Sequence, residues 1–284
     1  SCLLIALSWL LPRSNWAHWT TIAAVTLPTL LLIIGITIRC IIRSRPPVST
    51  LYETILFITA CAVLMALALE LINRQRIAIA VGAVLGMIGM FLAYRYELKE
   101  GVDTMPSLVA VLDTNFWLST HVTTVTAGYA AGLLSGAIAH IYIFSRFFNL
   151  RKNDRAYYRT LGRMCYGILA FGLIFATVGT ILGGIWANYS WGRFWGWDPK
   201  ENGALMIVLW SLVIFHARMG RYIGDLGTAI CSVLLAMIVA FSWWGVNLLG
   251  VGLHSYGFTS GIMNLLAVYW LTECLVIMVG LHVA

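Results

Sequence analysis

The sequence has little charge for its length. Only 10% of its 284 residues are Asp, Glu, Lys or Arg, whereas 61% are hydrophobic and the mean hydropathy is +0.88. This composition excludes a single soluble core and indicates that a lipid bilayer is the solvent. The net charge of +7 does not indicate a nucleic-acid partner, because most basic residues lie in short connections between apolar runs.

Cysteine is sparse and forms no recognisable motif. The six cysteines are isolated within apolar runs, with no CxxC or CxxCH pattern, which is typical of small buried hydrophobic side chains. They are Cys2, Cys40, Cys61, Cys165, Cys231 and Cys274. The chain also lacks a Walker loop, a zinc-ligand spacing and a clear nucleophile. No cleavable signal peptide is predicted, since no charged segment precedes the first apolar run.

Long apolar runs dominate the chain and predict transmembrane helices. A spanning helix needs about 20 apolar residues, and these runs are too long and unbroken for the strands of a barrel. The sequence therefore predicts an all-α polytopic bundle of about eight spans, forming a single membrane domain over residues 1–284. The predicted spans are 19–43, 52–72, 77–95, 116–144, 162–187, 203–219, 226–246 and 259–283, with a partial span at 2–12.

The charge of the connections predicts the orientation of the spans. The connection after the fourth span and its flanks contain six basic residues and only one acidic residue. The positive-inside rule therefore places that connection in the cytoplasm. The six basic residues are Arg146, Arg151, Lys152, Arg155, Arg159 and Arg163. Counting spans from there places residues 96–115, 188–202 and 247–258 together on the outer face.

Two arginines depart from this rule. The same count places Arg43 and Arg45 outside, with Arg39 just within the membrane. One interpretation is an error in the predicted topology or simple interfacial snorkelling. The other is that outward cations face an anionic ligand.

Four tryptophans gather in residues 186–202, WANYSWGRFWGWDPKEN, and we expect them to lie in a glycine-punctuated outer loop. They are Trp186, Trp191, Trp195 and Trp197. Tryptophan also anchors helices at bilayer interfaces, but such belts do not follow a W-x-W-D-P order. Indole rings beside Gly192 and Gly196 offer a rigid apolar platform that suits a planar macrocycle. Asp198 and Pro199 are typical of a helix N-terminus, so the first role expected of Asp198 is structural.

Three of the six histidines point to a binding role. His121 and His254 share the outer face with the tryptophans, and two imidazoles flanking an aromatic platform are suited to bind heme iron axially. His216 lies deep in its span, which indicates a different site. His140 lies nineteen residues beyond His121, about 28 Å along a helix, and is excluded from the same iron. The remaining two, His18 and His282, are interpreted as ordinary interfacial residues.

The segments WGRFWGWDPKE and GVNLLGVGLHSYGF resemble the tryptophan-rich (WWD) heme-handling domain of the CcsA (ResC) family of system II cytochrome c biogenesis. The upstream segments RPPVSTLYETILF and MPSLVAVLDTNFWLSTHVTTVTAGYAAGLL also resemble that family, so the similarity covers nearly all of residues 35–260. Sibling families in system I share the tryptophan motif, but the WDPKE continuation and the HSYG ending favour CcsA. The N-terminal apolar run does not align with the family.

The resemblance implies a function and a set of site residues. His121 and His254 would be the axial ligands of heme b at an outer platform, and His216 would belong to an intramembrane heme site. Trp191, Trp195, Trp197 and Asp198 would contact the cofactor, and Arg45, with Arg43 second, is the candidate for its propionates. The family's intramembrane site is completed by a CcsB (ResB) partner, so a similar membrane partner is expected here.

The expected function is to present heme at the outer face for thioether attachment to the CxxCH motif of apocytochrome c. The chain would then be the heme-binding part of a cytochrome c heme lyase (synthase), although its status as an enzyme stays open. The alternative is a heme exporter or chaperone without a synthase role. Thioredoxin-like thiol reductants are further expected partners, and nucleic acid is not. The expected location is the bacterial inner membrane or the thylakoid membrane, with the heme site periplasmic or lumenal.

Overall fold

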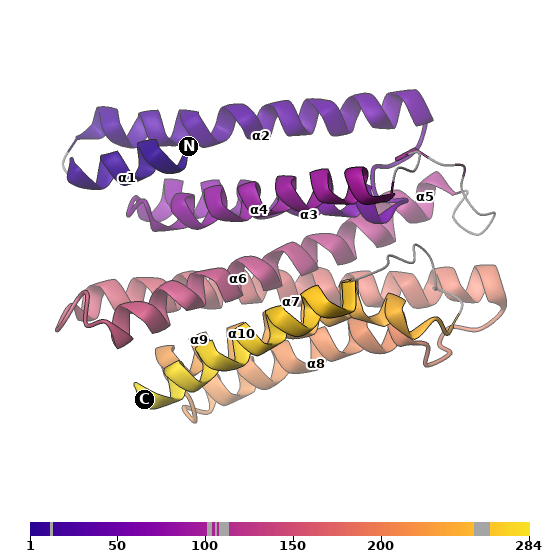
Figure 1. The fold of residues 1–284 in the computed structure, drawn as a ribbon. Coiled ribbons are helices and arrows are strands. Elements are labelled where there is room, and N and C mark those ends of the chain that lie inside the picture. Colours follow the sequence, from indigo (N-terminus) through magenta and orange to yellow (C-terminus); the bar gives the residue numbers. More distant parts are fainter. Residues whose placement is uncertain (12–13, 101–103, 106, 108–113, 253–261) are drawn as a thin grey trace. The chain divides into compact units, whose positions relative to one another are not determined.

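A computed structural model of the chain describes residues 1–11, 14–100, 104–105, 107, 114–252 and 262–284 (Figure 1). These residues form helices and connections, without a β-strand among them. The helices in chain order are α1 (Cys2–Leu10), α2 (Asn15–Arg43), α3 (Leu51–Asn73), α4 (Ile77–Glu100), α5 (Asn115–Trp117), the π-helix η2 (Leu118–Val122), α6 (Thr123–Phe147), α7 (Arg155–Trp191), α8 (Pro199–Met219), α9 (Asp225–Trp243), the 3₁₀-helix η3 (Gly245–Leu249) and α10 (Ile262–His282).

Eight helices in the described part of the chain are long and apolar enough to cross a membrane, which confirms the predicted all-α bundle. Each corresponds to one of the predicted spans. Several extend beyond the apolar run that predicted them, whereas α9 ends at Trp243, before the predicted end at 246. The helix α7 begins at Arg155 rather than at 162, because its first two turns carry basic residues that an apolar-run criterion leaves out. The partial span predicted at 2–12 is the short helix α1, whose nine residues cannot cross a bilayer.

The chain divides into two compact units, Ser1–Ser119 and Thr120–Ala284. In the first unit, α3 and α4 pack closely because α4 presents small residues to its neighbour. A Cβ atom at Gly82 would lie 2.6 Å from the Cβ of Ala66, and one at Gly89 would overlap the side chain of Thr59. Small residues at helix interfaces allow this close approach in membranes, where apolar side chains gain little by leaving lipid.

A buried polar cluster ties α1 and α2 to the α3–α4 connection in the same unit. The Arg76 guanidinium donates hydrogen bonds to three carbonyl groups at the end of α1 and the start of α2, those of Ser8, Leu11 and Ser14. The Arg76 backbone N–H donates to Glu70 (2.7 Å), and the His18 Nδ1 lies 3.6 Å from the same carboxylate oxygen. His18 is therefore buried against a carboxylate, and the interpretation of it as an ordinary interfacial residue is wrong.

In the second unit, α6 packs against α7 and α9 through a row of glycines. A Cβ at Gly128 would lie 2.9 Å from the backbone nitrogen of Ala176 on α7, and one at Gly136 would lie 2.6 Å from the Cβ of Ala236 on α9. The span that contains α6 is therefore the most enclosed of the eight. Of its 18 most apolar consecutive residues, 72% are buried within the protein. A residue at the start of α6 is consequently held in place by packing along the whole helix.

A buried carboxylate of α10 faces a half-buried histidine of α6 in this unit. His140 on α6 directs its Nδ1 at the Gly136 carbonyl (2.8 Å), and its Nε2 lies 3.0 Å from a carboxylate oxygen of Glu273 on α10. Glu273 is only 5% exposed and also accepts a hydrogen bond from the Tyr269 hydroxyl. His140 is thus satisfied within the bundle and distant from His121, as its position in the sequence indicates.

Candidate functional site

The tryptophan segment lies at the end of the second unit where α7 stops and α8 starts. Trp186 and Trp191 are helical, because α7 continues to Trp191 and ends at Gly192, which has a left-handed φ of 70°. The expectation that all four tryptophans lie in a loop is therefore wrong for these two. The connection between the helices is confined to residues 192–198, and it carries Trp195 and Trp197.

A capping box fixes the end of this connection. Asp198 accepts a hydrogen bond from the Glu201 backbone N–H (3.0 Å), and the Glu201 carboxylate accepts one from the Asp198 N–H (3.2 Å). The same carboxylate accepts from the Gly196 N–H (2.7 Å) and pairs with Arg193 (3.1 Å). The structural role expected of Asp198, with Pro199 in the first turn of α8, is confirmed. Sequence reasoning missed Glu201, although it stands at the N3 position of the capping-box pattern.

Replacing Asp198 by Ala is expected to destabilise the protein by about 0.5–2 kcal/mol, the usual cost of losing an N-cap side chain. Asp198→Asn should cost much less, because Asn caps helices as well as Asp does. Hydrogen exchange of the amides at Gly196 and Glu201 measures the effect locally. Equal protection in the Ala variant and the wild type would contradict the assigned role of the cap.

The connection offers aromatic surface around one buried polar atom. Trp197 is 69% exposed and has a φ of 59°, and its ring lies 6.0 Å from that of Trp195 at 85°. Phe194 is also exposed, with its ring passing over Gly184 of α7. The Trp195 Nε1 is buried and has no hydrogen-bond partner among the described residues. Exposed indole faces with one indole N–H in need of an acceptor fit a flat, largely apolar group that carries polar substituents.

His121 lies beside this end of α7, within the single turn of π-helix that begins the fourth span. Its Nδ1 lies 2.7 Å from the Gly179 carbonyl oxygen, and its ring meets the ring of Trp186 edge-on at 5.7 Å. A carbonyl can only accept, so Nδ1 carries the proton and Nε2 is the nitrogen with a lone pair for a metal. A hydrogen bond of this kind orients most metal-ligating histidines in proteins.

Two glycines of α7 allow close contact with His121 and with the start of α6. A Cβ at Gly183 would lie 2.6 Å from the Cε1 of His121, and one at Gly179 would lie 2.8 Å from the backbone of Val125. The imidazole therefore occupies space that any larger residue at position 183 would fill. The glycine spacing on α7 is visible in the sequence, but its contact with His121 requires the three-dimensional structure.

His254 falls among residues 253–261, which lie outside the described residues, as does the HSYG motif that contains it. The chain immediately before it does reach the tryptophan connection. A Cβ at Gly252 would lie 2.8 Å from the Cβ of Asp198, and Lys200 donates to the Trp243 carbonyl at the end of α9 (2.9 Å). Residues 243–252 and 192–200 are therefore adjacent. The place predicted for His254 beside the platform stays a prediction.

His216 is not brought near His121. It lies on α8, eighteen residues beyond Asp198 and so about 27 Å along the helix axis. Its Nδ1 faces the Leu212 carbonyl (2.8 Å), which leaves Nε2 as the ring nitrogen that can bind a metal. The side chain is exposed on the helix surface, where a ligand or a partner helix can reach it.

Arg43 and Arg45 belong to the first unit, at the end of α2 and just after it. Arg45 is only 9% exposed, and its backbone N–H donates to the Cys40 carbonyl. The nearby Arg39 pairs with the buried Glu53 (3.3 Å), which also accepts from Ser49. The role predicted for Arg43 and Arg45 at a propionate stays a prediction.

Comparison with known proteins gives a consistent family. The family model for Cytochrome C assembly protein matches residues 48–254, more than half of the chain. The Cytochrome c biogenesis protein CcsA of Chlamydomonas reinhardtii is 30% identical over 236 residues, which span 81% of this chain and 66% of that relative. CcsA of Synechococcus sp. (strain CC9902) is 29% identical over 82% of this chain and 85% of its own length. CcsA of Prochlorococcus marinus (strain NATL2A) is 32% identical over 74% of this chain and 76% of its own length. The chain therefore belongs to the CcsA family of cytochrome c assembly proteins.

Proposed function

We propose that this multi-pass membrane protein acts in cytochrome c biogenesis by holding heme at the tryptophan end of its second unit. The observation that carries the proposal is His121, whose ring is oriented by the Gly179 carbonyl and packed against Trp186, beside an aromatic surface that is partly exposed. His121 would bind the iron through Nε2, and His254 would be the second axial ligand. Trp191, Trp195 and Trp197 would contact the macrocycle, and Asp198 would keep their connection in place through its cap.

The chemistry of thioether formation belongs to heme, whose vinyl groups react with the two thiols of a CxxCH motif. The role proposed for the protein residues is to bind and orient heme. The indole surface would exclude water from the bound face of the macrocycle, and the Gly179 carbonyl fixes the His121 tautomer in which Nε2 carries the lone pair. The partner in this reaction would be apocytochrome c, with thioredoxin-like reductants keeping its thiols reduced. The proposed location is the bacterial inner membrane or the thylakoid membrane, with this site on the periplasmic or lumenal face.

His216 would serve a second, intramembrane heme site. Its imidazole is exposed and contacts the Leu212 carbonyl through Nδ1, and among the described residues no group of three or more His, Cys, Asp or Glu side chains forms a metal site. A CcsB (ResB)-like partner would supply the other ligand.

The absorption spectrum of the purified protein tests the outer site. We expect the wild type to contain heme b with a low-spin bis-histidine spectrum. His121→Gly should retain at least tenfold less heme, because it loses the imidazole nitrogen that would bind the iron. Added imidazole should restore much of that heme. His282→Gly removes an exposed histidine at the opposite end of the same unit and should leave the spectrum unchanged. An unaltered spectrum in His121→Gly would overturn the assignment.

The alternative function is heme export or chaperoning without attachment, and the exposed position of His216 is the observation that favours a transport step. Coexpression with an apocytochrome separates the two functions. A synthase role predicts cytochrome with covalently attached heme and copurification of the apocytochrome with this chain. Export alone predicts heme on the outer face without either result. In both cases His216→Ala should lower heme loading at the outer site.

A further inference from the structure

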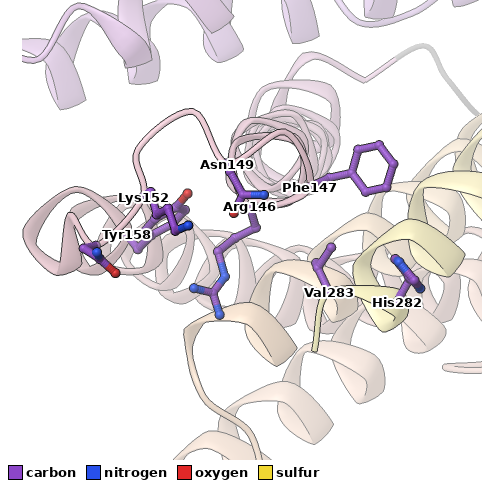
Figure 2. A pocket seen from close by; sticks show the side chains of 8 residues that line it. Arg146, Phe147, Asn149, Lys152, Tyr158, His282 and Val283 are labelled. Carbon is purple, nitrogen blue, oxygen red and sulfur yellow. The ribbon is translucent and has the colours of Figure 1, made fainter.

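A basic pocket of about 440 Å³ lies where α6 ends and α7 begins, at the other end of α7 from the tryptophan connection. Figure 2 shows side chains that line it. The pocket is bounded by the end of α6, the α6–α7 connection and the last residues of α10. The Arg146 side chain extends between Tyr158 and Lys152 on one side and Val283 on the other (Figure 2). The rings of Phe147 and His282 meet at 6.5 Å and hold the end of α10 against α6.

The groups that line this pocket are suited to an anion. Arg146 and Lys152 supply two positive charges, and Asn149, Asn153 and His282 add donors. The Arg146 guanidinium lies 5.3 Å from the centre of the Tyr158 ring, a cation–π contact that orients its N–H groups without neutralising them. No carboxylate belongs to the residues that line the pocket.

The nearest acidic side chains on the neighbouring helices have other partners. Asp154 caps α7 by accepting from the Tyr157 N–H (2.9 Å), and Asp225 at the start of α9 pairs with Arg218 (2.6 Å). Among the described residues, no ion pair joins Arg146 or Lys152 to a carboxylate. The pocket therefore keeps a net positive charge that a ligand can balance.

The position of the pocket indicates the source of that ligand. It opens at the ends of α6, α7 and α10, all three of which are candidate membrane spans, so it lies at the level of lipid headgroups. Phe147 is 41% exposed and lines the same pocket, as does Val283, which gives an apolar contact for the glycerol and upper acyl region. The volume equals that of about 15 water molecules at about 30 Å³ each, which is more room than one phosphate group needs.

We propose that this pocket binds the phosphate group of an anionic phospholipid, with Arg146 and Lys152 contacting the phosphate and Phe147 contacting the lipid beside it. Basic pockets between transmembrane helices recognise acidic headgroups in this way. The site is independent of the proposed heme function, since it lies at the other end of the unit and uses none of the same residues.

Native mass spectrometry of the detergent-purified full chain tests the site by titration with phosphatidylglycerol and, separately, phosphatidylcholine. We expect tighter binding of phosphatidylglycerol to the wild type. Lys152→Gln should weaken it about fivefold, because one basic residue near anionic lipid contributes about 1 kcal/mol. Arg146→Gln should weaken it at least as much. The matched control is Arg159→Gln, which removes one positive charge from an exposed position of α7 outside the pocket. This variant should change the affinity less than twofold.

Each comparison in this experiment can either support the lipid site or overturn it. Equal affinity for the two lipids, or equal loss in Lys152→Gln and Arg159→Gln, would overturn the proposal. Inorganic phosphate at millimolar concentration should compete weakly. If it displaces the lipid completely at that concentration, the site recognises free phosphate and the lipid assignment is wrong. Lys152 is exposed, and no ion pair among the described residues involves it, so its variant is expected to keep the wild-type unfolding temperature in neutral detergent.

Discussion

Replacing Glu273 by Ala is expected to destabilise the protein by about 3–5 kcal/mol, the usual cost of removing one partner of a buried ion pair. Glu273 is the carboxylate that faces His140 at 3.0 Å inside the bundle. Its loss leaves the His140 Nε2 and the Tyr269 hydroxyl without their buried partner. In the membrane interior neither group can turn to bulk water, so the penalty is not relieved by local solvation.

The matched variant Glu273→Gln should cost far less. A Gln side chain has nearly the same volume, its amide can donate to Nε2, and its carbonyl can accept from Tyr269. Thr272→Ala, at an exposed position next to it on α10, should change stability by less than about 0.5 kcal/mol. Unfolding of the three variants in the same detergent gives the comparison. If Glu273→Ala unfolds like Thr272→Ala, the pair does not stabilise the bundle.

The sequence predicted the spans well because the bilayer imposes a length and a composition on each helix separately. Errors occurred where a helix continues past its apolar part. The first two turns of α7 contain Arg155 and Arg159, and its last turn contains the polar Asn188 and Ser190. An apolar-run criterion therefore predicted a helix that is too short at both ends. The start of α8 was placed too late for the same reason, since Lys200 and Glu201 open that helix.

Contacts between distant residues could not be predicted in this way. His140 and Glu273 are separated by 133 positions, and nothing in either helix alone identifies the other as its partner. The burial of His18 was missed for the same reason, because its carboxylate partner Glu70 lies on the next helix, α3. By contrast, the cap at Asp198 could be predicted, since all of its partners lie within a few residues.

The importance of His121 was predicted from its place in the chain, but its orientation was not. The structure adds the Gly179 carbonyl, the Trp186 ring and the space above Gly183, all of which come from α7, about 60 residues later. A ligand histidine requires a fixed tautomer as well as the correct depth in the membrane, and only the packing of α6 on α7 supplies it.

Gly183→Ala is therefore expected to lower heme retention by about 10–100-fold, the range found when a group that orients a metal ligand is lost. This prediction rests on the proposed heme site. The new methyl group would lie 2.6 Å from His121 Cε1, so the ring must turn away and its bond to the Gly179 carbonyl must break. The substitution favours the helical state, because Ala is a better helix former than Gly by about 1 kcal/mol. A loss of heme would then not result from a weakened α7.

The control for this prediction lies on the same helix. At Gly167 a Cβ would meet no atom within 4 Å, so Gly167→Ala gains the same helix propensity without touching His121. Heme per protein, read from the absorption spectrum, should fall in Gly183→Ala and stay at the wild-type level in Gly167→Ala. Added imidazole distinguishes a displaced His121 ring from a missing one. In His121→Gly it can enter the space that the ring has left and restore heme binding. In Gly183→Ala the displaced ring still occupies that space, so imidazole should not restore binding. Wild-type heme retention in Gly183→Ala would show that the position of the His121 ring against α7 does not matter for binding.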